Sequence, residues 1–171
     1  MSDWIGPNVY RIENFKDPKT AVTVKDGSKE DGAVVVLKSA ETKKNDQWQF
    51  AHVGTGVSGK EEFLIINVNT GYHLTYAEGA KQAVLTVTRE SPTNVRCRWN
   101  IAPTRNGTGT FWIVAAQNNK MMLVTEGEST GDNAKLQIWE GPLKSKGTLW
   151  YLKLVDGHAL QSADLGKAPA P

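Results

Sequence analysis

The sequence predicts an all-β domain built from three similar segments that share one core. Trp48, Trp99 and Trp150 are each separated by 51 residues, and each is followed two positions later by a second apolar residue. Residues two apart on a strand point to the same face of a sheet, so each of these pairs is expected to face the interior. Self-similarity at a fixed interval indicates an internal repeat, and one repeat of 51 residues cannot bury its apolar face alone.

Short runs of β-branched and aromatic residues, separated by Gly, Asn, Asp and Lys, predict four strands in each repeat. The expected strands are residues 8–14, 20–25, 33–38 and 47–53, then 63–68, 73–76, 83–88 and 98–102, and finally 111–116, 121–125, 135–139 and 149–155. We therefore expect one closed domain over residues 1–156, with repeats at about 6–55, 56–105 and 106–156, and a C-terminal tail over residues 157–171.

Composition and charge exclude several classes of protein. The net charge is +2 with both signs interspersed, which gives no electrostatic footprint for nucleic acid. No segment approaches the roughly 20 apolar residues needed to span a bilayer, so membrane insertion is not expected. The single cysteine, Cys97, excludes an intramolecular disulfide and is typical of a reducing compartment. Because the N-terminal residues lack a secretory signal pattern, we expect a cytoplasmic location.

The three evenly spaced tryptophans, each near the end of a four-strand unit, resemble the pattern of the β-trefoil in the ricin B-type lectins. In having neither a disulfide nor a secretory signal pattern, the chain is similar to the cytosolic lectins of fungi. The runs 9–14, 67–74 and 133–139 also look like this family. Its Gln two residues before each tryptophan is replaced here by Asp46, Cys97 and Thr148. The resemblance implies a six-stranded barrel capped by three hairpins. It also implies a non-enzymatic lectin whose partners are glycans or glycoproteins. A role in fungal defence and the formation of a homodimer are both possible for such a lectin.

The resemblance also implies where a sugar would bind. In the family an aromatic residue at the end of the third strand of a repeat stacks on the sugar, and a Gln stands two residues before it. Counting back eleven residues from each core tryptophan gives Leu37, Thr88 and Trp139, so only the third repeat keeps a stacking platform. An Asp expected on the second strand is missing from all three repeats. The expected carbohydrate-binding residues are Trp139, Gln137, Asp132, Asn133 and Glu140.

Catalytic and metal-binding patterns are missing from the sequence. The three histidines and Cys97 lie in no recognisable catalytic motif, and Cys and His lack metal-ligand spacing. We expect no enzyme activity, no metal and no cofactor. Two alternatives to a lectin remain open: a protease inhibitor acting through the loop 54–60 or the loop 104–107, and a trefoil that only binds other proteins.

Overall fold

The structure, a computed structural model, describes residues 1–41, 43–56, 58–77, 84–140 and 145–155. Within these ranges the chain forms the strands β1 (Asn8–Asn14), β2 (Thr20–Val24), β3 (Ala33–Ser39), β4 (Trp48–Thr55), β5 (Glu61–Asn67), β6 (His73–Tyr76), β7 (Leu85–Thr88), β8 (Arg98–Pro103), β9 (Phe111–Ala115), β10 (Met121–Thr125), β11 (Ala134–Glu140) and β12 (Trp150–Leu154). These correspond to the twelve expected strands, and their bounds differ by up to two residues. The expected tail over residues 157–171 lies outside the described residues.

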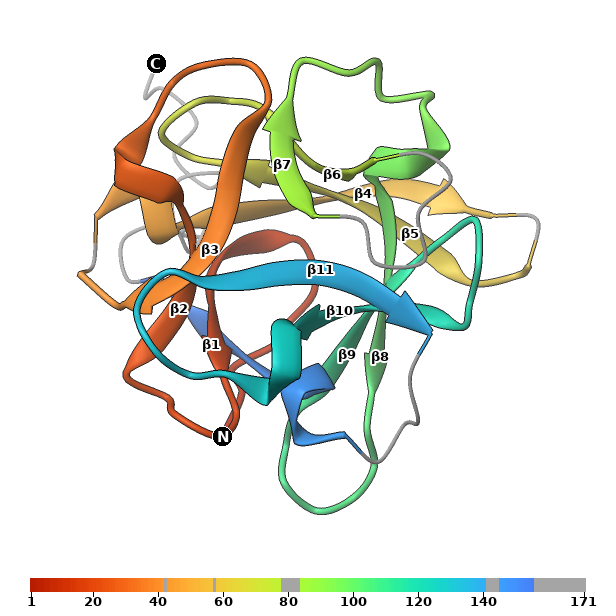
Figure 1. The fold of residues 1–171 in the computed structure, drawn as a ribbon. Coiled ribbons are helices and arrows are strands. Elements are labelled where there is room, and N and C mark those ends of the chain that lie inside the picture. The colour runs from red at the N-terminus through yellow and green to blue at the C-terminus, as the bar shows by residue number, and fades with distance from the viewer. Residues whose placement is uncertain (42, 57, 78–83, 141–144, 156–171) are drawn as a thin grey trace, which may run out of the picture.

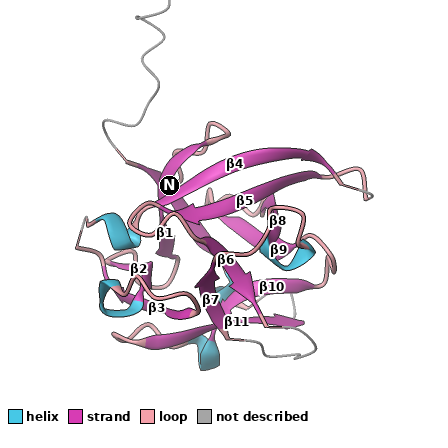
Figure 2. Ribbon diagram, turned by 90° about the horizontal axis from the view of Figure 1, so that it is seen from above, coloured by secondary structure: helices cyan, strands magenta, loops and turns pink. Residues whose placement is uncertain are grey.

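Six of the strands close into a barrel. Strand β1 pairs with β4, β4 with β5, β5 with β8, β8 with β9, β9 with β12, and β12 with β1, every pair antiparallel. The ring therefore has no free edge between first and last strand, which removes a common route to aggregation. The β4–β5 hairpin is longer than the others and projects to one side of the molecule (Figure 2).

The remaining strands form three hairpins that cap one end of the barrel. These are β2–β3, β6–β7 and β10–β11, and in Figure 1 strands β3, β7 and β11 lie around the centre of the cap. Each hairpin contacts the next at one equivalent place: Val34 lies opposite Thr86, Val84 opposite Gln137, and Lys135 opposite Val36. The three contacts repeat the same geometry, as a threefold arrangement of repeats requires.

Each core tryptophan joins the barrel to the cap. The indole N–H groups of Trp48, Trp99 and Trp150 donate to the carbonyls of Val22, Leu74 and Leu123 at 2.8, 3.0 and 3.1 Å. The three side chains are fully buried, in one apolar cluster. The expectation of one shared interior is confirmed. A buried indole needs a partner for its N–H, and here each finds it on the first strand of its own cap hairpin.

Short 3-10 helices occupy the connections. They are η1 (Lys25–Gly27), η2 (Lys44–Asp46), η3 (Val95–Cys97), η4 (Glu126–Glu128) and η5 (Lys146–Thr148). In the part of the chain that the structure describes, no helix is long and apolar enough to cross a membrane. Helices η2, η3 and η5 each end two residues before a core tryptophan, at Asp46, Cys97 and Thr148, which are all buried.

The side chains at those three positions tie each connection to its own backbone. Asp46 Oδ2 accepts from the Glu41 backbone N–H at 3.1 Å, and the Cys97 thiol and the Thr148 hydroxyl donate to backbone carbonyls at 3.0 and 2.7 Å. A side chain that can hydrogen-bond to its own turn is therefore sufficient here. These hydrogen bonds hold each turn, although the Gln expected from the resemblance is missing from all three repeats.

An aromatic cluster centred on Trp4 packs against the barrel core, and no local pattern in the sequence indicates it. The Trp4 ring lies 5.0 to 6.0 Å from the ring centroids of Tyr10, Phe50, Phe63 and Phe111. The Tyr10 hydroxyl accepts from the Ile5 N–H and donates to the Gly6 carbonyl. Trp4 thus brings together four barrel strands and fixes the N-terminal segment to them.

The strand register corrects one alignment made from the sequence. Trp139 lies opposite Met122 and Lys38 lies opposite Ala21, and each of these partners directly precedes the residue whose carbonyl accepts an indole hydrogen bond. The first-repeat equivalent of Trp139 is therefore Lys38, and not Leu37, which is a core residue. The connection to the core tryptophan is one residue shorter in the first repeat, so a fixed count of eleven is wrong there.

We predict that Trp99→Phe lowers the free energy of unfolding by about 2 to 4 kcal/mol, because it leaves the Leu74 carbonyl buried without its donor and a void beside a smaller ring. Trp112→Phe is the control. The Trp112 Nε1 atom is buried with no partner among the described residues, so its loss should change stability by less than about 1 kcal/mol. Urea unfolding followed by circular dichroism measures both values. Equal effects of the two substitutions would contradict the role given to the indole hydrogen bond.

Candidate functional site

The end of the β10–β11 hairpin carries the aromatic residue expected to bind a sugar. Side chains alternate along β11, so Ile138 faces the core and Trp139 faces outward, where it is partly exposed. Its cross-strand partner on β10, Met122, is buried. Glu140 follows in the same strand and is exposed, with its carboxylate 3.9 Å from the Lys120 ammonium. A ring held by a strand and reachable from solvent is suited to stacking on a flat apolar ligand face.

Gln137 shares the outward face of β11 with Trp139, two positions along the strand. It is only 8% exposed, because it lies opposite Val124 of β10 and its backbone bridges to Val84 of the neighbouring hairpin. Val124, at the position expected for the family's Asp, is buried, so no carboxylate faces this part of the hairpin from β10. The structure thus places Gln137 close to Trp139, on the side nearer to the neighbouring β6–β7 hairpin.

Asp132 and Asn133 do not join this group. They precede β11, whereas Trp139 and Glu140 end it, and a seven-residue strand separates its ends by roughly 20 Å. The expectation that all five residues gather in one place is corrected by this geometry. Asp132 Oδ1 accepts from the Ser39 backbone N–H at 2.8 Å and from its hydroxyl at 3.0 Å. Asn133 has a positive φ of 63° and donates from its backbone N–H to a carbonyl of β3 at 2.8 Å.

The same brace appears between the first and second repeats. Asp31 Oδ1 accepts from the Arg89 backbone N–H at 3.0 Å, and the Gly32 N–H donates to β7 at 2.8 Å. Asp31 and Asp132 therefore perform one structural task, joining the turn of one cap hairpin to the end of another. The Ser39 N–H and hydroxyl, which both donate to Asp132, hold the pKa of this carboxyl below its ordinary value of 3.8.

A third carboxylate, that of Glu128, connects η4 to the residue before η5. Glu128 accepts from the Ser145 hydroxyl at 2.7 Å and lies 3.4 Å from the Lys16 ammonium. The Ser145 hydrogen bond, followed by the Lys16 contacts, lowers the pKa of Glu128. Because its carboxylate already has these partners within the protein, Glu128 acts as a link between two connections of the third repeat.

The first repeat carries a polar depression of about 580 Å³ at its rim. Its lining comes from η1, the end of β3, the connection through η2, and one residue of the next repeat: Asp26, Gly27, Lys38, Glu41, Lys43, Lys44, Asn45 and Asn69. None of these side chains is aromatic. The Asn69 amide donates to the Gly27 carbonyl at 3.3 Å and fixes the wall between the repeats.

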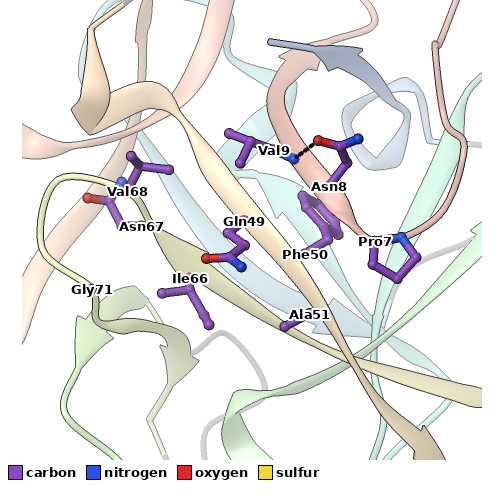
Figure 3. A pocket seen from close by; sticks show the side chains of 10 residues that line it. All are labelled: Pro7, Asn8, Val9, Gln49, Phe50, Ala51, Ile66, Asn67, Val68 and Gly71. Carbon is purple, nitrogen blue, oxygen red and sulfur yellow. Dashed lines mark hydrogen bonds between the residues drawn. The ribbon is translucent and has the colours of Figure 1, made fainter. Parts of the chain in front are cut away.

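A second depression, of about 560 Å³, lies on the side of the barrel and is mostly apolar. Figure 3 shows its lining from β1, β4, β5 and the residues beside them: Pro7, Asn8, Val9, Gln49, Phe50, Ala51, Ile66, Asn67, Val68 and Gly71. Phe50 is 1% exposed and belongs to the core, so no ring is free for stacking here. This depression therefore offers no exposed aromatic ring.

The sequence of residues 44–139, more than half of the chain, matches the family described as ricin-type β-trefoil lectin domain-like. The chain belongs to this family. An agglutinin of Sclerotinia sclerotiorum is 34% identical over 100 residues, which are 57% of this chain and 63% of the agglutinin.

Several solved structures share the fold of this chain at lower sequence identity. The Rhizoctonia solani agglutinin has a TM-score of 0.73 at 16% identity, covering 89% of this chain and 98% of the agglutinin. The Macrolepiota procera ricin B-like lectin, solved in complex with lactose, has a TM-score of 0.72 at 17% identity, covering 90% and 100% of the two chains. The designed threefold-symmetric protein ThreeFoil has a TM-score of 0.74 at 21% identity, covering 84% and 96%. All three support the β-trefoil.

Two other kinds of site, a metal site and a reactive thiol, are missing from the described residues of this ricin-type domain. Within residues 1–41, 43–56, 58–77, 84–140 and 145–155, no three His, Cys, Asp or Glu side chains form a group that could hold a metal ion. Cys97 is buried, and burial raises the pKa of its thiol, which keeps it protonated and inert.

The loop after β8 contains residues 104–107, one of the two loops considered for protease inhibition. Arg105 in this loop has a positive φ of 53°, and the Thr104 hydroxyl contacts the carbonyl and the hydroxyl of Thr110 beside it.

We predict that Asp132→Ala lowers the urea midpoint of unfolding near neutral pH and that this difference shrinks in acid. The folded-state pKa of Asp132 lies below its unfolded value, so its contribution is fully present above pH 3.8 and is lost as the pH falls through the folded pKa. Glu126→Ala is the control, because the Glu126 side chain is exposed and has no partner among the described residues. A midpoint difference for Asp132→Ala that did not change with pH would contradict the charge-assisted brace.

Proposed function

We propose that this protein is a non-enzymatic lectin that binds glycans at the rim of the third repeat, with Trp139 as the stacking platform. The observation that carries the proposal is a partly exposed indole at the end of a cap strand, in a chain that belongs to the ricin-type lectin family. The names of its relatives agree with sugar binding: one is an agglutinin, and one was solved with lactose.

Trp139 is selected because the other tryptophans are already used by the fold. Trp48, Trp99 and Trp150 are fully buried and Trp4 packs among four aromatic rings. Trp112 is also partly exposed, but it is the second residue of barrel strand β9, away from the cap hairpins, and its Nε1 atom is buried. Trp139 stands at the open end of β10–β11, where one face of a sugar ring can approach it.

Polar groups beside the ring would orient the ligand. Glu140 offers an exposed carboxylate as acceptor for sugar hydroxyls, and Lys120 offers donors next to it. Gln137 is on the same face but nearly buried, so we assign it the role of supporting the ring and contacting only a group that reaches past it. Asp132 and Asn133 hold β3 and are left with a structural task.

Affinity at one such rim should be weak. One stacking ring and a few exposed hydrogen bonds support a dissociation constant of about 1 mM for a monosaccharide, or about 4 kcal/mol. Useful binding then needs contacts to several sugar units, or a homodimer that presents two rims together.

We also propose that the protein is located in the cytoplasm and has a role in fungal defence. A feeding assay that compares the wild-type protein with a sugar-binding variant tests the defensive role.

We predict that Trp139→Ala weakens glycan binding by about tenfold while the fold survives, because it removes the aromatic face. Trp139→Phe keeps an aromatic face and should retain most of the binding. Trp112→Phe serves as the control on a tryptophan outside the rim. A glycan array identifies the ligand, calorimetry gives the affinities, and near-ultraviolet circular dichroism reports the fold. Unchanged binding by a folded Trp139→Ala protein would refute this site.

A protease inhibitor remains the alternative function, and one observation weighs against its basic loop after β8. A protease cleft that binds its ligand as an added strand needs extended backbone, whereas Arg105 has a φ of 53°. We predict no inhibition of trypsin or papain at micromolar concentration. Stoichiometric inhibition that persists in Trp139→Ala would favour the inhibitor, and capture of a protein partner that no sugar displaces would favour a protein-interaction trefoil.

A further inference from the structure

We infer that the polar depression of the first repeat binds the anionic group of an acidic saccharide, either a carboxylate or a sulfate ester. This inference rests on the proposed lectin function and adds a ligand class and a second position to it. It depends on three observations: the residue that takes the place of Trp139, the amines that line the depression, and the amides that face the same space.

The register places a lysine where the third repeat has its stacking ring. Lys38 lies one residue before the end of β3, as Trp139 does in β11, and both face outward at the rim. With no aromatic side chain in the lining, a neutral sugar finds no platform in this depression. An ammonium group in that place instead attracts a negatively charged substituent.

Two of the three lysines in the lining have no ion pair within the described residues. Lys43 is engaged by Glu41, whose carboxylate accepts from it, whereas Lys38 and Lys44 have no carboxylate within 4.0 Å in the described part of the chain. Counting Asp26, the lining holds three ammonium groups and two carboxylates, so it carries one net positive charge. The hydrogen bond from Lys43 lowers the pKa of Glu41, and the charge of Lys38 adds to this effect. An incoming anion would therefore meet two amines that need not leave an existing partner.

Amide groups provide for the neutral part of the ligand. Asn45 and Asn69 both line the depression, and Asn69 uses its amide N–H on Gly27, which leaves its Oδ1 as an acceptor. Amides can accept from and donate to sugar hydroxyls, so they suit the ring that carries the charge. The volume of about 580 Å³ is within the range of small-ligand sites and accommodates one sugar unit with its substituent.

The experiment compares sugars that differ only in charge. Glucuronic acid is paired with glucose, and galactose 6-sulfate with galactose, in NMR titrations of the full chain at low salt. We expect each acidic member to bind about fivefold more tightly than its neutral partner, with the preference falling as salt is added. Chemical-shift changes for the acidic sugars should centre on Lys38, Lys44 and Asn45. The two pairs show whether carboxylate, sulfate ester or both are accepted.

Lys38→Gln and Lys44→Gln should each reduce the preference, and the double variant should abolish it. Lys146→Gln is the matched control, because Lys146 begins η5 as Lys44 begins η2, but in the third repeat. Equal binding of acidic and neutral sugars by the wild type, or a preference that survives the double variant, would overturn the inference.

Failure of this inference and failure of the proposed function give different results. Neutral glycan binding that depends on Trp139, without a preference for acidic sugars, overturns the inference and leaves the lectin rim intact. A preference for acidic sugars that depends on Lys38 and Lys44, with neutral-glycan binding unchanged in Trp139→Ala, supports the inference and refutes the third-repeat rim. Absence of any saccharide binding overturns both.

Discussion

The hydrogen bond from a core indole to the first strand of a cap hairpin is the constraint on which this fold depends. It occurs three times, from Trp48, Trp99 and Trp150, with donor–acceptor distances of 2.8 to 3.1 Å. In each case it joins a barrel strand to the hairpin above it, inside an apolar interior where an unmade bond would be costly. The bond fixes where each hairpin sits on the barrel, and so fixes the threefold arrangement of the rims.

Because the interior is fixed in this way, the outward face of each hairpin can vary. Equivalent rim positions hold Lys38, Thr88 and Trp139, which differ in charge, size and aromatic character. The Thr88 hydroxyl is used within the second repeat, in a 2.8 Å contact with Thr75. An ammonium group and an indole present two different chemistries to solvent, so one scaffold offers rims suited to different parts of a glycan.

The sequence was sufficient to predict the strands, the repeats and the shared core, because these follow from the spacing of the tryptophans and the period of apolar residues. It was insufficient for the alignment of the first rim, since a connection shorter by one residue moves Lys38 into the place assigned to Leu37. The sequence also suggested that Asp132 lies near Trp139, because the two are only seven positions apart. In the structure, most of strand β11 lies between them. Trp4 was missed because its partners come from four different strands, which no local pattern reveals.

Hydrogen exchange of the six indole N–H protons, followed by NMR, tests the central constraint most directly. The account predicts that the indole protons of Trp48, Trp99 and Trp150 exchange only with global unfolding, at one common free energy that matches urea unfolding. The Trp139 indole proton should exchange orders of magnitude faster, because it lies at an exposed rim. Rapid exchange at any one of the three core indoles, while the other two stayed protected, would contradict a fold held by three equivalent bonds.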